Sequence, residues 1–211
     1  MKRVINLDNW NRKEHFKFFS ALDDLFWGIT TTVDFTSIYQ QSKNMEVSFF
    51  LYSVHFLLKC INATTAFKLR IENGEVVEYD KINISPTIRR EDGTFGFGFF
   101  EYDTDLSLFI ENAEKEIHRV KNSTGLSFSK DTARADVIRY SALPWFAFSE
   151  MKHAGSIQTG DSIPKISTGK LIQEKKKLLL PISISVHHGL VDGRNVAEFI
   201  QNVKDGQNNT L

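Results

Sequence analysis

The sequence predicts an α+β fold, built as a single domain over residues 1–211. Helical and strand-like hydrophobic patterns mix along the whole chain, and no repeat, linker or low-complexity stretch divides it. A chain of 211 residues with 41% hydrophobic residues is long and apolar enough to bury a substantial core. Only the polar tail over 205–211 is expected to fray.

In the first half of the chain we expect one helix and one hairpin. Apolar side chains recur at helical spacing over 48–62, and Ser48 is placed to cap that helix. Two apolar segments, 67–71 and 76–79, flank Asn73-Gly74, a pair that adopts the positive φ angles of a tight turn at little cost. These segments therefore predict a β-hairpin.

Two more elements are expected in the middle of the chain. Segment 94–101 is rich in Phe with Gly96 and Gly98 interspersed, which fits a strand with a bulge or a close backbone approach. Over 105–120 the apolar side chains mark one face of a helix, and Thr104 is placed to cap it.

The C-terminal part is expected to form a strand and then a helix. Over 178–188 apolar and polar side chains alternate, so His188 falls on the apolar face and His187 on the other. Pro181 cannot donate a hydrogen bond to the sheet, so the strand begins there, lies at an edge or bulges. A helix is expected after Gly193.

His188 is the candidate for chemistry within this pair. Neighbouring strand residues point to opposite faces, so at most one of them enters a given site. On the apolar face the loss of water disfavours the imidazolium, which keeps the His188 ring neutral and able to accept a proton near pH 7. The alternative is that both histidines are packed structural residues. A metal site is not expected, because His188 and Asp192 span a turn and no second pair of ligands accompanies them.

Composition argues against several classes of protein. Lys+Arg and Asp+Glu number 26 each, so bulk charge does not favour binding to nucleic acid. Cys60 is the one cysteine, so no internal disulfide can form, and we expect a buried, inert thiol in a reducing, cytoplasmic setting. The apolar run 49–58 is too short to span a membrane, and no signal peptide is visible near the N-terminus.

Three segments resemble the chloramphenicol acetyltransferases. Residues 187–193 (HHGLVDG) match the His-His-x-x-x-Asp-Gly signature of a superfamily of CoA-dependent acyltransferases. Residues 10–16 (WNRKEHF) and 141–145 (SALPW) are similar to two further segments of the family, in its order and close to its spacing. Gly169-Lys170 followed by 178–181 also resembles the family's approach to the histidine motif. The resemblance covers essentially the whole chain.

The resemblance implies a role for each matching residue. His188 corresponds to the family's general base, which takes a proton from the hydroxyl of the acceptor. Ser141 corresponds to its oxyanion hydrogen-bond donor. Asp192 and Arg12 correspond to a structural ion pair, although the closeness of Asp192 to His188 also suggests a charge-relay partner. Ser167 stands where the family has a threonine that helps to organise the oxyanion region through water.

The resemblance also implies an acceptor pocket and a cofactor-binding lysine. The family's pocket is lined by aromatic and aliphatic side chains, whereas His153 and Arg139 add polarity in this sequence. Lys170 matches a lysine of the family's Gly-Lys segment and is expected near the phosphates of acetyl-CoA. The implied pocket positions are Phe18, Phe19, Trp27, Phe95, Met151 and His153.

The resembled fold has two layers, with a large mixed sheet covered by helices, and assembles as a homotrimer with active sites between subunits. The implied activity is acetyl transfer from acetyl-CoA to a hydroxyl of chloramphenicol, a small-molecule acceptor, without an acyl-enzyme. Three alternatives stay open: the same chemistry on another hydroxyl acceptor, an acyltransferase of the 2-oxo acid dehydrogenase type, and a non-catalytic binding protein on this fold.

Overall fold

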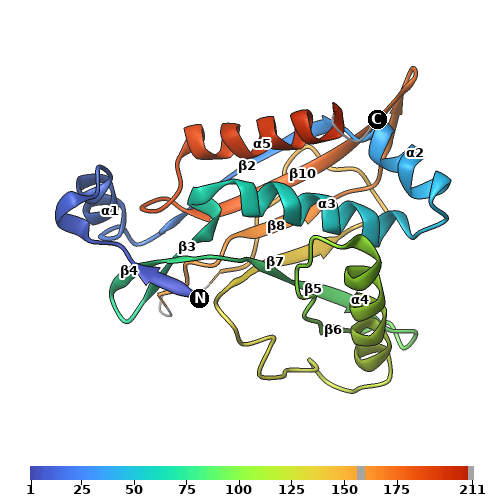
Figure 1. Cartoon of the computed structure of the whole chain (residues 1–211), viewed down its shortest axis with the longest axis horizontal. Helices are drawn as coiled ribbons and strands as arrows, with labels where there is room; N and C mark the ends of the chain where they lie inside the picture. The colour runs from blue at the N-terminus through green and yellow to red at the C-terminus, as the bar shows by residue number, and fades with distance from the viewer. Residues whose placement is uncertain (156–159, 209–211) are drawn as a thin grey trace.

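A mixed sheet with helices packed on one of its faces forms the body of the molecule (Figure 1). The computed structural model describes residues 1–155 and 160–208. Over these residues the α-helices are α1 (Lys13–Phe19), α2 (Thr36–Asn44), α3 (Phe49–Ala63), α4 (Leu106–Lys121) and α5 (Gly193–Asn208). Two short 3-10 helices cover Leu7–Asn9 and Thr65–Lys68. In this part of the chain no helix is long and apolar enough to cross a membrane.

The strands form a large sheet and a small one. They are β1 (Lys2–Val4), β2 (Phe26–Asp34), β3 (Leu69–Glu72), β4 (Glu75–Tyr79), β5 (Asn83–Arg89), β6 (Phe95–Phe97), β7 (Val137–Ala142), β8 (Lys165–Thr168), β9 (Ile172–Glu174) and β10 (Lys177–His187). The large sheet runs β2-β10-β8-β7-β5-β6, with β9 added beside β10, and the small sheet runs β1-β4-β3. Strands β5, β7 and β8 are parallel to one another and the other pairs are antiparallel, so the sheet is mixed, as the resemblance implied.

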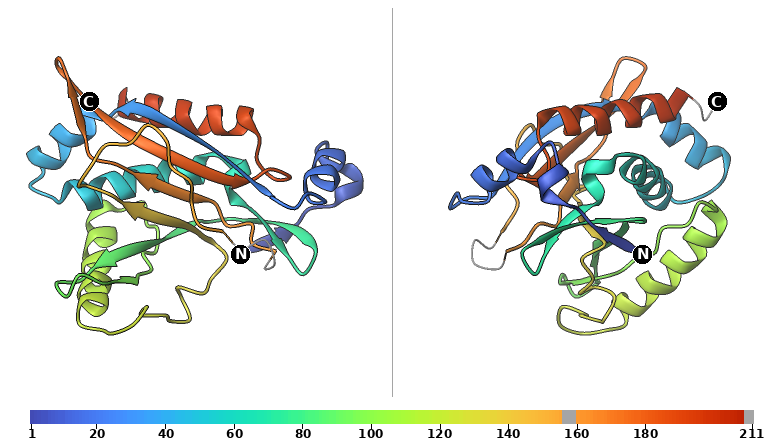
Figure 2. Two further views of the ribbon diagram at one scale, coloured as in Figure 1. Left: turned by 180° about the vertical axis from the view of Figure 1, so that it is seen from behind. Right: turned by 60° about the vertical axis from the view of Figure 1, so that its left-hand side comes forward.

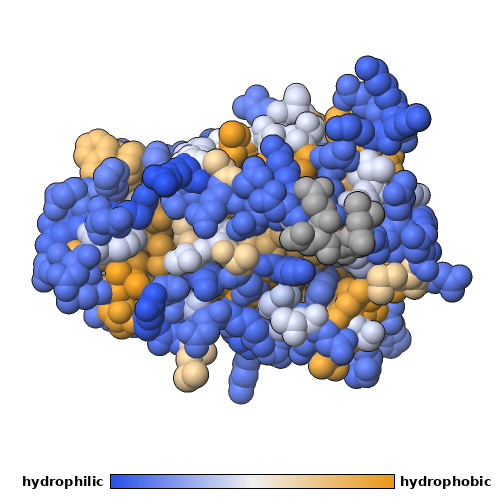
Figure 3. Space-filling view, turned by 45° about the horizontal axis from the view of Figure 1, so that its top comes forward, coloured by the Kyte–Doolittle hydropathy of each residue, from blue (hydrophilic) through white to orange (hydrophobic). Residues whose placement is uncertain are grey.

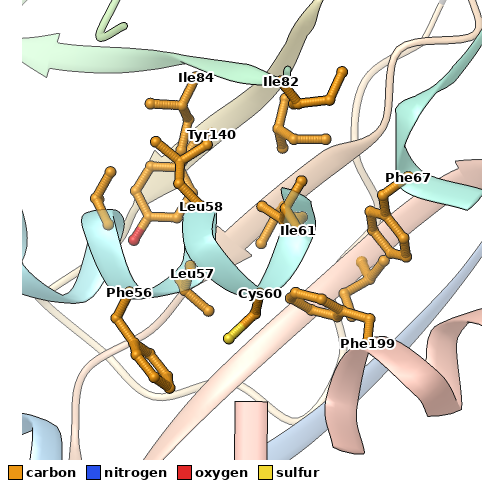
Figure 4. Packing of buried hydrophobic residues seen from close by; sticks show 14 of the residues in the cluster. Phe56, Leu57, Leu58, Cys60, Ile61, Phe67, Ile82, Ile84, Tyr140 and Phe199 are labelled. Carbon is orange, nitrogen blue, oxygen red and sulfur yellow. The ribbon is translucent and has the colours of Figure 1, made fainter. Parts of the chain in front are cut away.

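Helix α3 occupies the centre of the helical layer and packs against α2, α4 and α5. Figure 4 shows its side chains between strands of the large sheet and Phe199 of α5. Cys60 is 4% exposed in this core, and burial raises the pKa of its thiol to about 12, so the thiol is inert, as expected. Removing this apolar surface from water is the main source of stability for the helix–sheet packing.

The opposite face of the large sheet is polar. Ser183 of β10 pairs in register with Ser167 of β8, and Ser167 pairs with Ser141 of β7. Side chains in register on neighbouring strands point to the same face, so a row of hydroxyls lies there. The coil after β7 crosses this face (Figure 2, left), and Ser183 Oγ donates a hydrogen bond of 3.3 Å to the carbonyl of Met151. One face thus carries the core and the other carries polar groups under a coil.

The helix and hairpin expected in the first half are confirmed, with small differences at their ends. Helix α3 begins directly after Ser48, whose side chain makes no capping hydrogen bond. Strands β3 and β4 form the hairpin around Asn73 and Gly74, whose φ angles are 51° and 82°. The first strand starts later than predicted, because residues 67–68 belong to the 3-10 helix.

Two predictions for the middle of the chain need correction. Asp105, not Thr104, caps helix α4, because its carboxylate accepts hydrogen bonds from the backbone N–H groups of Ser107 and Leu108. The Phe-rich segment forms only the short strand β6, yet the close backbone approach is present. A Cβ on Gly96 would lie 2.5 Å from Nη2 of Arg90.

The frayed tail expected from residue 205 is wrong over 205–208. Helix α5 continues through these residues, and Gln207 is 8% exposed and accepts a hydrogen bond of 3.2 Å from Ser37 Oγ. Residues 209–211 of the expected tail lie outside the described part of the chain. Pro181 lies inside β10, between the residues that pair with β9 and those that pair with β8. Its carbonyl accepts a hydrogen bond from the backbone N–H of Gly169. The ring nitrogen of Pro181 therefore falls in a gap where no ladder bond is required.

Candidate active site

His188 stands at the point where β10 ends. The strand stops at His187, and the backbone N–H of His188 donates a hydrogen bond of 2.8 Å to the carbonyl of Leu25. The imidazole stacks on Phe19 with ring centroids 3.6 Å apart and planes 10° apart, and Trp27 lies 5.5 Å away. Its Nδ1 is buried and has no hydrogen-bond partner among the described residues. Stacking between aromatic rings fixes the orientation of this imidazole.

His187, rather than His188, is the deeply buried histidine of the pair. It is 1% exposed, whereas His188 is only partly buried. Burial lowers the pKa of His187 to about 4, so its ring is neutral at pH 7. Its Nδ1 accepts a hydrogen bond of 3.2 Å from Gly189 N–H, which fixes the turn after β10. The prediction that His188 is the more desolvated ring of the pair is wrong, because both faces of β10 are covered and His187, the last residue of the strand, is buried on the face opposite the helices.

Asp192 joins the N-terminal segment to the turn that carries His188. Its Oδ2 forms an ion pair with Arg12, and its Oδ1 accepts hydrogen bonds from Arg194 N–H at 2.9 Å and Asn195 N–H at 3.2 Å. Burial alone raises the pKa of Asp192, but the Arg12 contact and these N–H groups outweigh it, and the pKa is lowered. The carboxylate thus stays charged, pairs with Arg12 and caps α5.

Ser141 lies in the hydroxyl row on the polar face of the sheet. Thr87 Oγ1 donates a hydrogen bond of 3.3 Å to Ser141 Oγ. In the neighbouring strand, Ser167 Oγ is 3.0 Å from Nε2 of His153, whose pKa is lowered by burial and by the charge of Lys165. The structure therefore brings Ser141, Ser167 and His153 to one region of this face.

His188 and Ser141 do not meet within one chain. His188 follows Ser183 by five residues, and Ser183 lies two strands from Ser141 in register. At about 3.4 Å per strand residue and about 4.8 Å between strands, their Cα atoms are on the order of 20 Å apart. The base and the oxyanion donor must both lie within hydrogen-bonding distance of the reacting groups around one carbon atom. His188 and Ser141 of the same chain are too far apart to do so.

A cavity of about 520 Å³ lies beside this polar face. Trp27, Met151 and His153, three of the implied pocket residues, line it together with strands β2, β8 and β10. Phe18 and Phe95 lie elsewhere and are exposed, at 64% and 46%. The structure thus gathers only part of the implied pocket within one chain. Figure 3 shows apolar side chains scattered between polar ones over the exposed surface of the molecule.

Sequence reasoning missed Lys165, which also lines the cavity. Lys165 is 5% exposed although it carries an ammonium group. The signal in the sequence was a lysine between Pro164 and Ile166, in a segment short of other charges, where a buried charge needs a partner. Lys170 is exposed, as a phosphate-binding lysine would be, and its backbone N–H donates to the carbonyl of Phe146 at 2.9 Å. Within the described residues, no group of three or more His, Cys, Asp or Glu side chains is arranged to hold a metal ion.

Comparison with known proteins agrees with this geometry. The family model described as chloramphenicol acetyltransferase matches residues 2–204. Chloramphenicol acetyltransferase 3 of Escherichia coli is 27% identical over 207 residues, covering 98% of this chain and 97% of the relative. A chloramphenicol acetyltransferase of Clostridioides difficile is 28% identical over 205 residues, covering 95% of this chain and 93% of the relative.

Solved structures share the fold. A chloramphenicol acetyltransferase structure superposes with a TM-score of 0.90 at 29% identity, covering 98% of this chain and 100% of the other. A probable dihydrolipoamide acetyltransferase of Listeria monocytogenes 4b F2365 has a TM-score of 0.69 at 13% identity, covering 98% of this chain and 94% of the other, which is a likeness of fold. By the match over nearly its whole length, this chain belongs to the chloramphenicol acetyltransferase family and is an acyltransferase.

Proposed function

We propose that this protein transfers the acetyl group of acetyl-CoA to a hydroxyl of chloramphenicol, with His188 as general base and Ser141 as oxyanion donor. The observation that carries the proposal is the placement of His188. Its ring is held flat against Phe19 at the end of β10, out of reach of Ser141 in the same chain. A base that is fixed in orientation at the surface of one subunit suits an acceptor bound by a neighbouring subunit.

His188 takes the proton from the acceptor hydroxyl as that oxygen attacks the acetyl carbonyl carbon. A positioned base of this kind contributes on the order of 10² to 10⁴ in rate. The new C–O bond forms while the carbonyl oxygen gains the negative charge. When the C–S bond breaks, the imidazolium of His188 returns its proton to the departing thiolate, so the enzyme ends as it began. No acyl-enzyme is required.

Ser141 donates its hydroxyl proton to the oxygen that gains charge. The hydrogen bond from Thr87 occupies a lone pair of Ser141 Oγ and leaves the proton of Ser141 free to point toward the substrate. Ser167, next to Ser141 in register, supports this region through a water molecule. Loss of one oxyanion donor costs on the order of 10² to 10³ in rate. Lys170, exposed after β8, is proposed to meet the phosphates of acetyl-CoA.

The active site is proposed to form between subunits of a homotrimer. His188 of one subunit would face Ser141 and the cavity of the next, because the two groups are too far apart in one chain. Closed cyclic assembly repeats this contact at each interface. Dissociation into monomers is therefore expected to abolish acetyl transfer.

A thiol-release assay with acetyl-CoA and chloramphenicol tests the proposal. The wild-type protein should release CoA, and His188→Ala should reduce the rate by at least about 10²-fold. His118→Ala, which changes an exposed histidine on α4, serves as the matched control and should retain the wild-type rate. Near wild-type turnover by folded His188→Ala would refute the general-base role.

A different hydroxyl acceptor is the second candidate function. His153 and Lys165 make the cavity more polar than an apolar drug pocket requires. CoA release with other hydroxyl acceptors but none with chloramphenicol would favour it. No release with any acceptor would favour a binding protein on this fold.

A further inference from the structure

The cavity of about 520 Å³ combines apolar walls with a buried cation. Phe26 of β2 and Met151 of the coil after β7 line it on the apolar side. Lys165 of β8 and Ser185 of β10 line it as well, and they pair in register. A pocket with aromatic walls and few polar groups fixes a small molecule by those polar groups.

Lys165 shares one carboxylate with a second cation. Its Nζ lies 3.3 Å from Oδ2 of Asp161, and Arg139 Nη1 donates a hydrogen bond of 2.8 Å to the same oxygen. The side chains of Lys165 and Asp161 are each 7% exposed. Two cations and one carboxylate leave this cluster with one net positive charge. Because Arg139 already neutralises Asp161, Lys165 can turn its ammonium toward a ligand without stranding a buried charge.

The remaining groups around the cavity do not cancel this charge. Burial and the nearby Lys165 lower the pKa of His153, so its ring is neutral at pH 7. Asp24, Glu150 and Lys152 also line the cavity, but all three are exposed and solvated. Exposed charges are screened by water and salt much more strongly than a buried ammonium. The ring of Phe26, whose centroid is 4.2 Å from Lys165 Nζ, helps to hold that ammonium in place.

We propose that Lys165 makes this cavity a site for hydroxyl acceptors that carry a carboxylate, in addition to chloramphenicol. The carboxylate would bind the ammonium of Lys165, and an aromatic or aliphatic body would pack against Phe26 and Met151. This inference rests on the proposed acceptor role of the cavity. It assigns to Lys165 a part in acceptor specificity, because a buried ammonium discriminates between a charged ligand and its neutral analogue.

Tropate and methyl tropate test the inference as a matched pair. Both carry a phenyl ring and a primary hydroxyl, and they differ in that the carboxylate of tropate is replaced by an uncharged methyl ester. In the thiol-release assay the wild-type protein should show a higher kcat/KM for tropate than for the ester. Lys165→Met should lower the ratio of the two kcat/KM values roughly tenfold to hundredfold, as expected for the loss of a hydrogen bond to a charged group. Lys59→Met, at an exposed lysine of α3, is the control and should leave the ratio unchanged.

Asp161→Asn is a second variant, for which the opposite change in the kcat/KM ratio is expected. It keeps the inference testable even if Lys165→Met does not fold. Removing the competing carboxylate should raise the preference for tropate, since Lys165 then has only the ligand as an anionic partner. Equal use of both acceptors by the wild-type protein, or a ratio that neither variant changes, overturns the inference. A raised KM for acetyl-CoA in Lys165→Met, equal with both acceptors, also overturns it, because it assigns Lys165 to the phosphates of acetyl-CoA.

Calorimetric titration separates this inference from the proposed function. Binding of tropate and of its ester is measured in the presence of CoA without turnover. If no acceptor supports CoA release, the proposed function fails, but tighter binding of tropate that depends on Lys165 still supports the charge-selective site. If chloramphenicol is acetylated and tropate binds no more tightly than its ester, only the inference about Lys165 fails.

Discussion

Asp192 pairs with Arg12 across 180 residues of chain through one carboxylate oxygen and caps helix α5 through the other. The two tasks can be separated by substitution, because Asn keeps a capping oxygen but loses the charge. The Arg12 side chain is 17% exposed and that of Asp192 is 34% exposed, so the pair is partly shielded from solvent.

Asp192→Asn should therefore lower the free energy of unfolding by about 1 kcal/mol, and Asp192→Ala by about 1 kcal/mol more, since it also removes the cap. Urea denaturation followed by circular dichroism measures both. The pKa of Asp192 is lowered in the folded state, so its contribution is present at neutral pH and is lost as the pH falls through that lowered value. Asp8→Asn, at an exposed pair with Lys13, is the control and should cause no measurable change. A loss of activity in Asp192→Asn with stability intact would contradict the structural role.

His187 should make the protein less stable in mild acid. Its pKa is about 4 in the folded state and near its ordinary value of 6.5 in the unfolded state. Between these two pH values the unfolded chain binds a proton at His187 and the folded chain does not. Stability from this residue is complete above pH 6.5 and declines as the pH falls toward 4, by on the order of 3 kcal/mol. His187→Asn keeps an acceptor for Gly189 N–H but does not titrate, so its stability should change less between pH 6.5 and pH 4. Equal slopes for both proteins would show that His187 is not the titrating group.

Mixed oligomers test whether the active site is shared between subunits. His188→Ala and Ser141→Ala should each be nearly inactive alone. Co-expressed in equal amounts, they should regain activity, because about a quarter of the interfaces in a random cyclic assembly join an intact His188 to an intact Ser141. The rate of thiol release by the co-expressed protein is compared with the rate of a control sample. In the control, the two variants are purified separately and then mixed under conditions in which subunits do not exchange. A co-expressed mixture no more active than the separate variants would indicate that the site lies within one chain.

A side chain at Gly96 should destabilise the folded protein. A Cβ there would lie 2.5 Å from Arg90 Nη2 and 2.9 Å from Val120 Cγ1. Arg90 is 6% exposed and donates to the carbonyls of Val120 and Gly125, so it has little room to move. Gly96→Ala is expected to cost about 1–3 kcal/mol of stability, measured by chemical denaturation. Gly93 has a φ of 85° and open space where a Cβ would lie. Gly93→Ala therefore measures the loss of stability that comes from the backbone conformation alone, without a steric clash. A smaller loss in Gly96→Ala than in Gly93→Ala would contradict the steric argument.

Local patterns in the sequence were sufficient to locate several elements. Helix α3 and the hairpin around Asn73-Gly74 were predictable, because apolar spacing and turn chemistry act over a few residues. The cap of α4 was misplaced by one residue, since Thr104 and Asp105 both carry capping side chains and only the backbone angle of the helix start selects between them. The polar composition of residues 205–208 predicts a tail, whereas Gln207 accepts a hydrogen bond from Ser37, a partner far away in sequence.

Within the candidate site, the sequence identified single residues better than it identified their neighbours. The Arg12–Asp192 pair was anticipated from matching motifs and is present. The burial of His187 was not, because the alternation of apolar and polar residues in β10 suggests one buried face, whereas residues on both faces of the strand are buried. Lys165 was missed because its burial depends on Phe26, which packs against it from the distant strand β2, as well as on its ion pair with Asp161, four residues before it. That the whole chain is one domain, and that it assembles as a trimer, stay predictions.

The polar face of the large sheet separates the proposed acceptor site from the packing that keeps the protein folded. Apolar side chains of β10 face the helices, while its serines face a coil that contributes Met151 and His153 to the cavity. Substitutions in that coil therefore leave the hydrophobic packing around α3 untouched. An enzyme built this way can exchange one acceptor for another through mutations of small energetic consequence, and its specificity is free to diverge faster than its fold.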